Sequence, residues 1–113
     1  MPRFVVFFTL TGQTINRFID QPSDRAAAVR ALIEPVGGKL ISYDFMFGED
    51  DGMVIIEVAD SQSAAAISLA VSSTGAFSRL RTHELIPADQ INPVLERARA
   101  ARASYRPPGA AAG

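Results

Sequence analysis

The chain of 113 residues is 48% hydrophobic, has a net charge of −1, and contains one histidine and no cysteine. Its length and apolar content predict one domain with a real core, and the missing cysteines exclude disulfides, thiolate metal sites and cysteine nucleophiles. The balanced charge gives no electrostatic sign of nucleic-acid binding, and no apolar stretch approaches membrane-spanning length. We therefore expect neither nucleic acid nor a membrane as a partner.

The N-terminal third predicts a strand followed by helical segments. Residues 4–10, FVVFFTL, are apolar on both alternating faces and predict a covered strand. This run is too short for a signal peptide, and we expect a cytoplasmic protein. Residues 13–19 predict a short helical turn, and a helix should begin near Ser23, capped by Asp20 or Ser23. Gly37 and Gly38 should end that helix, after a last turn that Pro35 distorts. Its expected buried stripe is Ala26, Val29, Leu32, Ile33 and Val36.

A hairpin is expected next, with strands at residues 39–47 and 53–58 joined by the loop GEDDG. Strict alternation predicts that Val54, Ile56 and Val58 line one face of the second strand, with Met53, Ile55 and Glu57 on the other. On the first strand it assigns one face to Ile41, Tyr43, Phe45 and Phe47, and the opposite face to Leu40, Ser42, Asp44 and Met46.

The C-terminal half predicts a helix, a strand and a second helix. Asp60 and Ser61 should cap a helix at residues 62–72, and residues 76–86 should form the last strand. Arg79, Arg81 and His83 would share one face of that strand. Asn92 should cap a final helix, which divides the chain into a domain at residues 1–92, a helix at 93–104 and a disordered tail at 105–113. That helix carries several arginines, which most simply form a solvated face.

The order β-α-β-β-α-β is the ferredoxin-like pattern. We therefore predict an α+β fold, with a four-stranded antiparallel sheet, two helices on one face and an additional C-terminal helix. The other face would remain open while carrying Val5, Phe7 or their neighbours on the first strand, together with Met53 and Ile55. Because such an apolar face usually has a partner, we expect a homodimer or higher oligomer of the dimeric α/β-barrel type.

Three short motifs in order resemble the GYD domain family of bacterial proteins. They are Gly37-Gly38-Lys39-Leu40, then Gly48-Glu49-Asp50-Asp51, then the segment IEVAD at residues 56–60. The resemblance covers roughly residues 2–88 and departs from the family at Asp50, where the family pattern Gly-Glu-Tyr-Asp has tyrosine. It implies a small ferredoxin-like protein without an established activity.

The acidic loop GEDDG has two interpretations. Adjacent carboxylates suit a hard cation, but an EF-hand needs a loop of about twelve residues and this loop has five. Glycine and aspartate also favour turns for conformational reasons. We favour the turn, and we expect no metal site and no cofactor.

The open sheet face is the better candidate for a site. Asp44, Glu57, Arg81 and His83 are the candidate ligand-binding residues there, and His83 is the one side chain whose ordinary pKa lies near neutrality. The alternative is that these charges form rim ion pairs, some of them across a dimer interface. No catalytic residue is assigned.

Two functions remain open. The first is a non-catalytic module that binds a small apolar or aromatic ligand or forms an assembly interface. The alternative is a cofactor-free isomerase or monooxygenase acting on an aromatic or quinone-like substrate, an analogy with other dimeric barrels. An enzyme should show an open pocket into which His83, Asp44 or Glu57 points, whereas an interface protein should have that face covered.

Overall fold

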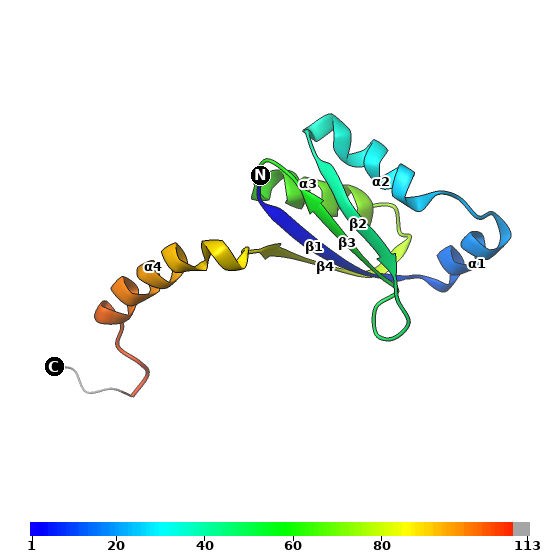
Figure 1. The fold of residues 1–113 in the computed structure, drawn as a ribbon. Coiled ribbons are helices and arrows are strands. Elements are labelled where there is room, and N and C mark those ends of the chain that lie inside the picture. The colour runs from blue at the N-terminus through cyan, green and yellow to red at the C-terminus, as the bar shows by residue number, and fades with distance from the viewer. Residues whose placement is uncertain (110–113) are drawn as a thin grey trace.

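A computed structural model of the protein describes residues 1–109. Its core is a four-stranded antiparallel sheet in the order β2-β3-β1-β4, built from β1 (Arg3–Leu10), β2 (Lys39–Phe45), β3 (Gly52–Glu57) and β4 (Phe77–Leu85). Helices α2 (Arg25–Ile33) and α3 (Ser61–Ser72) cover one face, with α2 over β2 and α3 over β4 (Figure 1). The predicted α+β, ferredoxin-like order is confirmed.

The helical layer differs from the prediction in its details. The expected short turn is a nine-residue helix, α1 (Gly12–Asp20), because Thr11 accepts the backbone N–H of Thr14 and caps it. The cap of α2 is Asp24, so the predicted caps Asp20 and Ser23 were wrong. Pro35 does distort the end of that helix, which continues as a 3-10 turn over Glu34–Val36 before Gly37 at φ 74°.

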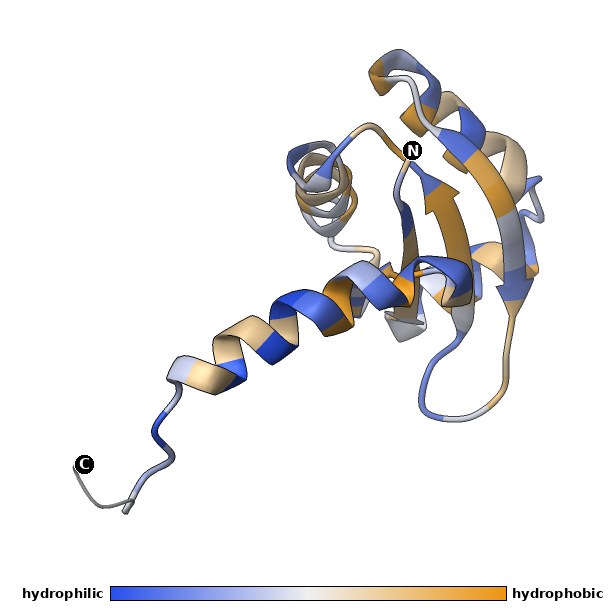
Figure 2. Ribbon diagram, turned by 60° about the vertical axis from the view of Figure 1, so that its left-hand side comes forward, coloured by the Kyte–Doolittle hydropathy of each residue, from blue (hydrophilic) through white to orange (hydrophobic). Residues whose placement is uncertain are grey.

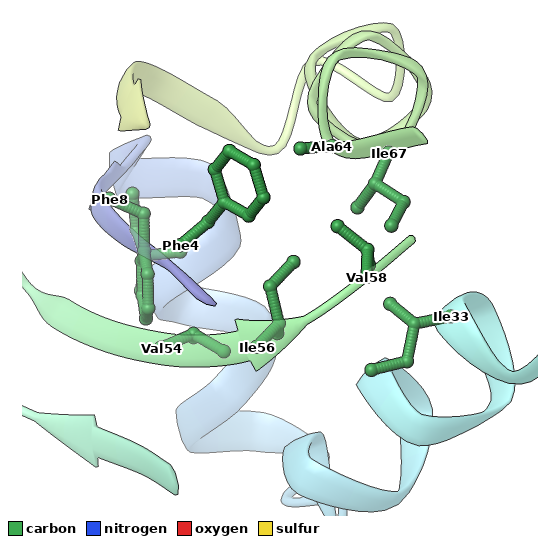
Figure 3. Packing of buried hydrophobic residues seen from close by; sticks show 9 residues of the cluster. Phe4, Phe8, Ile33, Val54, Ile56, Val58, Ala64 and Ile67 are labelled. Atoms are coloured by element: carbon green, nitrogen blue, oxygen red, sulfur yellow. The ribbon is translucent and has the colours of Figure 1, made fainter. Parts of the chain in front are cut away.

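The core lies between α2, α3 and the sheet. Ile33 from α2 and Ala64 and Ile67 from α3 point toward the strands, with Ile56 and Val58 between them (Figure 3). Leu32 and Val36, which were expected in the buried stripe of α2, are 36% and 42% exposed. The other buried hydrophobic residues of the cluster are Phe4, Phe8, Leu10 and Val54.

A β-bulge changes the predicted faces of β2. The pairing with β3 shifts between Leu40 and Ser42, so Leu40 lies opposite Ile56 and Tyr43 lies opposite Val54. Leu40 and Tyr43 therefore both face the core, and strict alternation across Ile41 was wrong. The strand also ends at Phe45, and Phe47 lies fully exposed in the loop.

The last helix, α4 (Ile91–Ser104), projects away from the sheet (Figures 1 and 2). It follows a 3-10 turn at Ala88–Gln90, and its N-cap is Gln90 without a side-chain hydrogen bond, so the prediction of Asn92 as cap was wrong. All of its residues except the half-buried Ile91 are exposed. Of the tail expected to be disordered, residues 105–109 are exposed and outside any helix or strand, and residues 110–113 lie outside the described part.

Candidate functional site

The face of the sheet opposite α2 and α3 has an apolar centre and a polar rim. Its centre consists of Val5 and Phe7 on β1 and Met53 and Ile55 on β3, the two inner strands. The charged residues lie mostly on the edge strands, with Asp44 on β2 and Arg79, Arg81 and His83 on β4. This distribution has the anatomy of a protein interface, in which a polar rim surrounds an apolar core.

The register arranges this face in rows that run across all four strands. One row is Asp44, Met53, Phe7 and Arg81. The next row along the strands is Ser42, Ile55, Val5 and His83, and the third is Lys39, Glu57, Arg3 and Leu85. Each of the first two rows has two apolar residues in the middle and polar side chains at both ends.

The four candidate residues share this face but do not all lie together. Neighbouring strands are about 4.8 Å apart, so Asp44 and Arg81, at opposite ends of one row, lie about 14 Å apart. Glu57 is four residues along β3 from the partner of Asp44, again about 14 Å away. His83 is exposed, and its ring contacts Phe7 edge-on at a centroid distance of 6.2 Å. Arg81 and His83 are therefore neighbours on β4, both in contact with Phe7, while Asp44 lies far from Arg81 and from Glu57, and the role of the four residues in binding stays a prediction.

Glu57 already has a partner within the chain. Its Oε1 accepts a hydrogen bond from Nε of Arg3 at 2.9 Å. This hydrogen bond holds the pKa of Glu57 below its usual value, with the charges of Arg3 and Lys39 acting in the same direction. Glu57 is therefore an ionised rim residue at neutral pH, which does not suit a general acid.

The acidic loop is tied to the end of β1 through Asp51. The carboxylate of Asp51 accepts the backbone N–H of Leu10 at 2.8 Å, where the pairing of β1 with β4 is irregular. The backbone N–H of Asp51 donates to the carbonyl of Phe8 at 2.8 Å. Asp51 thus acts within the fold, and residues 1–109 contain no cluster of three or more Asp, Glu or His side chains able to hold a metal ion.

Asp50 supports Arg81, a contact that sequence reasoning missed. Oδ2 of Asp50 lies 2.5 Å from a terminal nitrogen of Arg81, and Oδ1 accepts from the hydroxyl of Thr9 at 3.4 Å. The guanidinium also lies over the ring of Phe7, 5.0 Å from its centroid. Asp50 therefore fixes Arg81 at the edge of the apolar centre. No local pattern links positions 50 and 81, since only the sheet register brings them together.

An apolar cavity lies on the other side of the sheet, between α2 and α3. It has a volume of 60 Å³ and is walled by Ile33, Ile67 and Val71 from the helices and by Phe8, Tyr43 and Phe77 from the sheet, among others. Asp44, Glu57 and His83 are not among its lining residues. This cavity is therefore not the open pocket that the enzyme hypothesis requires on the opposite face of the sheet.

Tyr43 is the polar side chain of the cavity wall, and sequence reasoning missed it. Burial raises the pKa of its phenol, while the nearby charge of Arg25 and a hydrogen bond with Arg25 act in the opposite direction. Its pKa stays above the ordinary value near 10, so the hydroxyl is protonated at neutral pH. The single tyrosine on the apolar face of the first hairpin strand was the one signal for it.

Comparison with known proteins agrees with this fold. The GYD domain family matches residues 4–95. The structure is similar to that of FFRP-DM1, at 14% identity, TM-score 0.51, and coverage of 76% of this chain and 100% of that one. Ribosomal protein S6 from Thermotoga maritima is 17% identical with a TM-score of 0.54, covering 89% of this chain and 97% of that one. The chain matches 52% of the length of MtbAldR, at 14% identity, TM-score 0.51 and 75% of its own length. No curated protein sequence matches it. At these identities the similar structures support the fold alone.

Proposed function

The chain belongs to the GYD domain family, and within that family we propose that it is a non-catalytic assembly module that forms a homodimer through its open sheet face. One observation carries this proposal: the rows of that face are complementary to a second copy of themselves. Of the candidate residues, Glu57 lines a surface hollow together with Arg3 and Glu84, but its carboxylate is already paired with Arg3, so within the described residues the assembly module is favoured over the enzyme alternative.

The complementarity follows from two-fold symmetry. A two-fold axis that lies between the two sheets and runs along the strands places each row opposite the same row of the second copy, with the order of its residues reversed. Asp44 then lies opposite Arg81 of the second copy, and Met53 lies opposite the second Phe7. In the next two rows Ile55 lies opposite the second Val5, and Glu57 opposite the second Arg3. Acids then meet bases and apolar residues meet apolar residues, except at the ends of the third row, where Lys39 lies opposite Leu85 of the second copy.

The other two-fold axis in this plane fits poorly. An axis across the strands, through the row of Val5, places Phe7 opposite Arg3 of the second copy and Met53 opposite Glu57. Charges would then be buried against apolar side chains without compensation, which is costly. The charge pattern therefore favours the axis along the strands. Asp50 contributes by holding Arg81 in place before the second copy arrives, which lowers the entropy lost on binding.

Light scattering across a range of concentrations tests the assembly. We expect a mass of twice the 12.1 kDa chain at micromolar concentration, and a monomer for Phe7→Glu, which places a charge at the centre of the face. Ile19→Glu is the matched control, because Ile19 is 71% exposed on α1, away from this face, and should leave the dimer intact. A wild-type mass of 12.1 kDa at these concentrations would refute the proposal.

Cross-linking tests the symmetry axis, and the chain has no cysteine of its own to interfere. Packed sheets lie about 10 Å apart, so a short thiol-specific linker can join opposed positions. We expect a mixture of Asp44→Cys and Arg81→Cys chains to form cross-linked heterodimers, because these positions face each other only across the axis along the strands. The Asp44→Cys chain alone should cross-link far less. The reverse pattern would contradict this axis while leaving the dimer itself in place.

A further inference from the structure

The end of the sheet from which α4 departs carries a surface hollow that the paired rows of the proposed interface leave unexplained. The hollow has a volume of 760 Å³ and lies against the third row, because Arg3, Glu57 and Leu85 of that row line it. Its lining continues into the connection between β4 and α4 at Asp89 and into the first turn of α4 at Val94. The hollow therefore belongs both to the open face and to the start of α4.

Acidic side chains outnumber basic ones among the residues that line this hollow. Glu57 is paired with Arg3, but Glu84 and Asp89 form no ion pair within residues 1–109. Both of these acids are exposed. A base that enters the hollow can pair with either carboxylate without breaking an existing contact, so the hollow suits a positively charged group.

Lys39 of the second copy is the base that the proposed axis brings to this place. In the third row it lies opposite Leu85, the one kind of pair in these rows in which a charge meets an apolar side chain. Glu57, its neighbour in its own chain, is already bonded to Arg3. Packed sheets lie about 10 Å apart, and the long, flexible side chain of lysine can span much of that gap. Asp89, which shares the hollow with Leu85, then offers this lysine a carboxylate.

Helix α4 has little packing of its own within residues 1–109. It projects from the sheet in both views, and its apolar side chains Val94 and Leu95 are 41% and 56% exposed (Figures 1 and 2). A helix of 14 residues is only marginally stable in water without packing. Three arginines against one glutamate make α4 positive, whereas residues 1–90 contain more acids than bases. Two α4 helices therefore repel each other, and the acidic body of the second copy is the favoured partner of α4.

We propose that in the dimer this hollow receives the start of β2 of the second copy, with Lys39 paired to Asp89 and the first turns of α4 packed over the end of that strand. The inference rests on the proposed dimer and adds a symmetric pair of contacts to it. It also removes the mismatch in the third row, because the charge of Lys39 gains a partner instead of lying against Leu85 alone. Helix α4 is then an arm that holds the second copy.

Charge reversal tests the contact between Lys39 and Asp89. Within one chain these residues belong to opposite edges of the sheet, so they can pair only between copies. Lys39→Glu alone and Asp89→Lys alone should each raise the dissociation constant of the dimer about tenfold, because two attractive pairs become repulsive. An equal mixture of the two variants should form heterodimers about as tight as the wild-type dimer, since every pair across the axis is again opposite in charge. Asp20→Lys, an exposed acid at the end of α1, is the matched control and should leave the dissociation constant unchanged.

Hydrogen exchange tests the packing of α4. Its amides should exchange about tenfold more slowly in the wild-type dimer than in the Phe7→Glu monomer, because the second copy supplies the packing that a single chain lacks. Val94→Glu should weaken the dimer and speed the exchange. Ala103→Glu lies nine residues further along and on the opposite side of α4, so it should do neither.

Three results would overturn this inference. They are single charge reversals that leave the dimer as tight as the wild type, a mixture of the two variants that associates no better than each alone, and α4 amides that exchange equally in dimer and monomer. Where the wild type is a dimer, each of these results refutes the part played by Asp89 and α4 and leaves the open-face dimer in place. A wild-type mass of 12.1 kDa would instead refute the dimer itself, and this inference with it.

Discussion

Gly52 offers the sharpest test of how the sheet is packed. It begins β3 directly opposite Phe8 of β1, and the Phe8 ring lies over it. A Cβ atom added at Gly52 would lie 2.0 Å from the tip of that ring and 2.4 Å from a neighbouring ring carbon. Gly52→Ala therefore cannot be accommodated unless the ring moves. Phe8 is 2% exposed and contacts the rings of Tyr43, Phe45 and Phe77, so its movement disturbs the core.

The expected cost follows from where the ring can go. Overpacking a well-filled core costs about 1–3 kcal/mol. Phe8 also lines the 60 Å³ cavity, which gives its ring some room to move and places the expected loss near the middle of that range, at about 2 kcal/mol. With an unfolding entropy of about 2.1 cal/mol/K per residue, a 113-residue chain should then melt about 8 °C lower.

Thermal and urea unfolding followed by circular dichroism measure this loss. Gly12→Ala is the control, because a Cβ at Gly12 has no atom within 4 Å, and it should melt at or above the wild-type temperature. Phe8→Leu should cost stability by itself, but Gly52→Ala should cost much less in that background, since the clashing ring is gone. If Gly52→Ala lowers stability by less than about 0.5 kcal/mol, or if the two substitutions are additive, the proposed contact is wrong.

Two further outcomes are expected. Asp51→Ala should lower the free energy of unfolding, measured by urea titration, by about 1–2 kcal/mol, because the N–H of Leu10 loses its acceptor. Glu49→Ala, on the same loop, is the control and should leave the free energy of unfolding unchanged. Added calcium should change neither result. The cap of α3 should make stability depend on pH: the N–H of Ser63 holds the pKa of Asp60 below its ordinary value, so this contribution is full above the unfolded pKa and is lost as the pH falls through the folded one. Asp60→Asn should flatten that part of the acid titration, and an unchanged slope would contradict the assignment.

The sequence by itself predicted the order of the elements and the faces of two strands, β3 and β4. Period-2 alternation placed Val54 and Ile56 on one face and Met53 and Ile55 on the other, as the register has them. It did so because a side chain on a regular strand has only two directions to point. The same rule failed on β2, where the bulge at Ile41 inserts a residue that alternation does not foresee. The same alternation predicted the open apolar face, because it placed Met53 and Ile55 on the side of the sheet opposite Val54 and Ile56.

Contacts between distant residues were decided by the tertiary structure alone. The acidic loop was correctly interpreted as a turn, yet the sequence did not show that Asp51 binds the N–H of Leu10 or that Asp50 binds Arg81, since both contacts depend on the register of strands far apart in the chain. It also could not show that Asp44 lies far from Arg81 and from Glu57, or that Tyr43 lines a cavity between the sheet and the helices. Local patterns decide which way a side chain points, and the packing of the whole chain decides what that side chain meets.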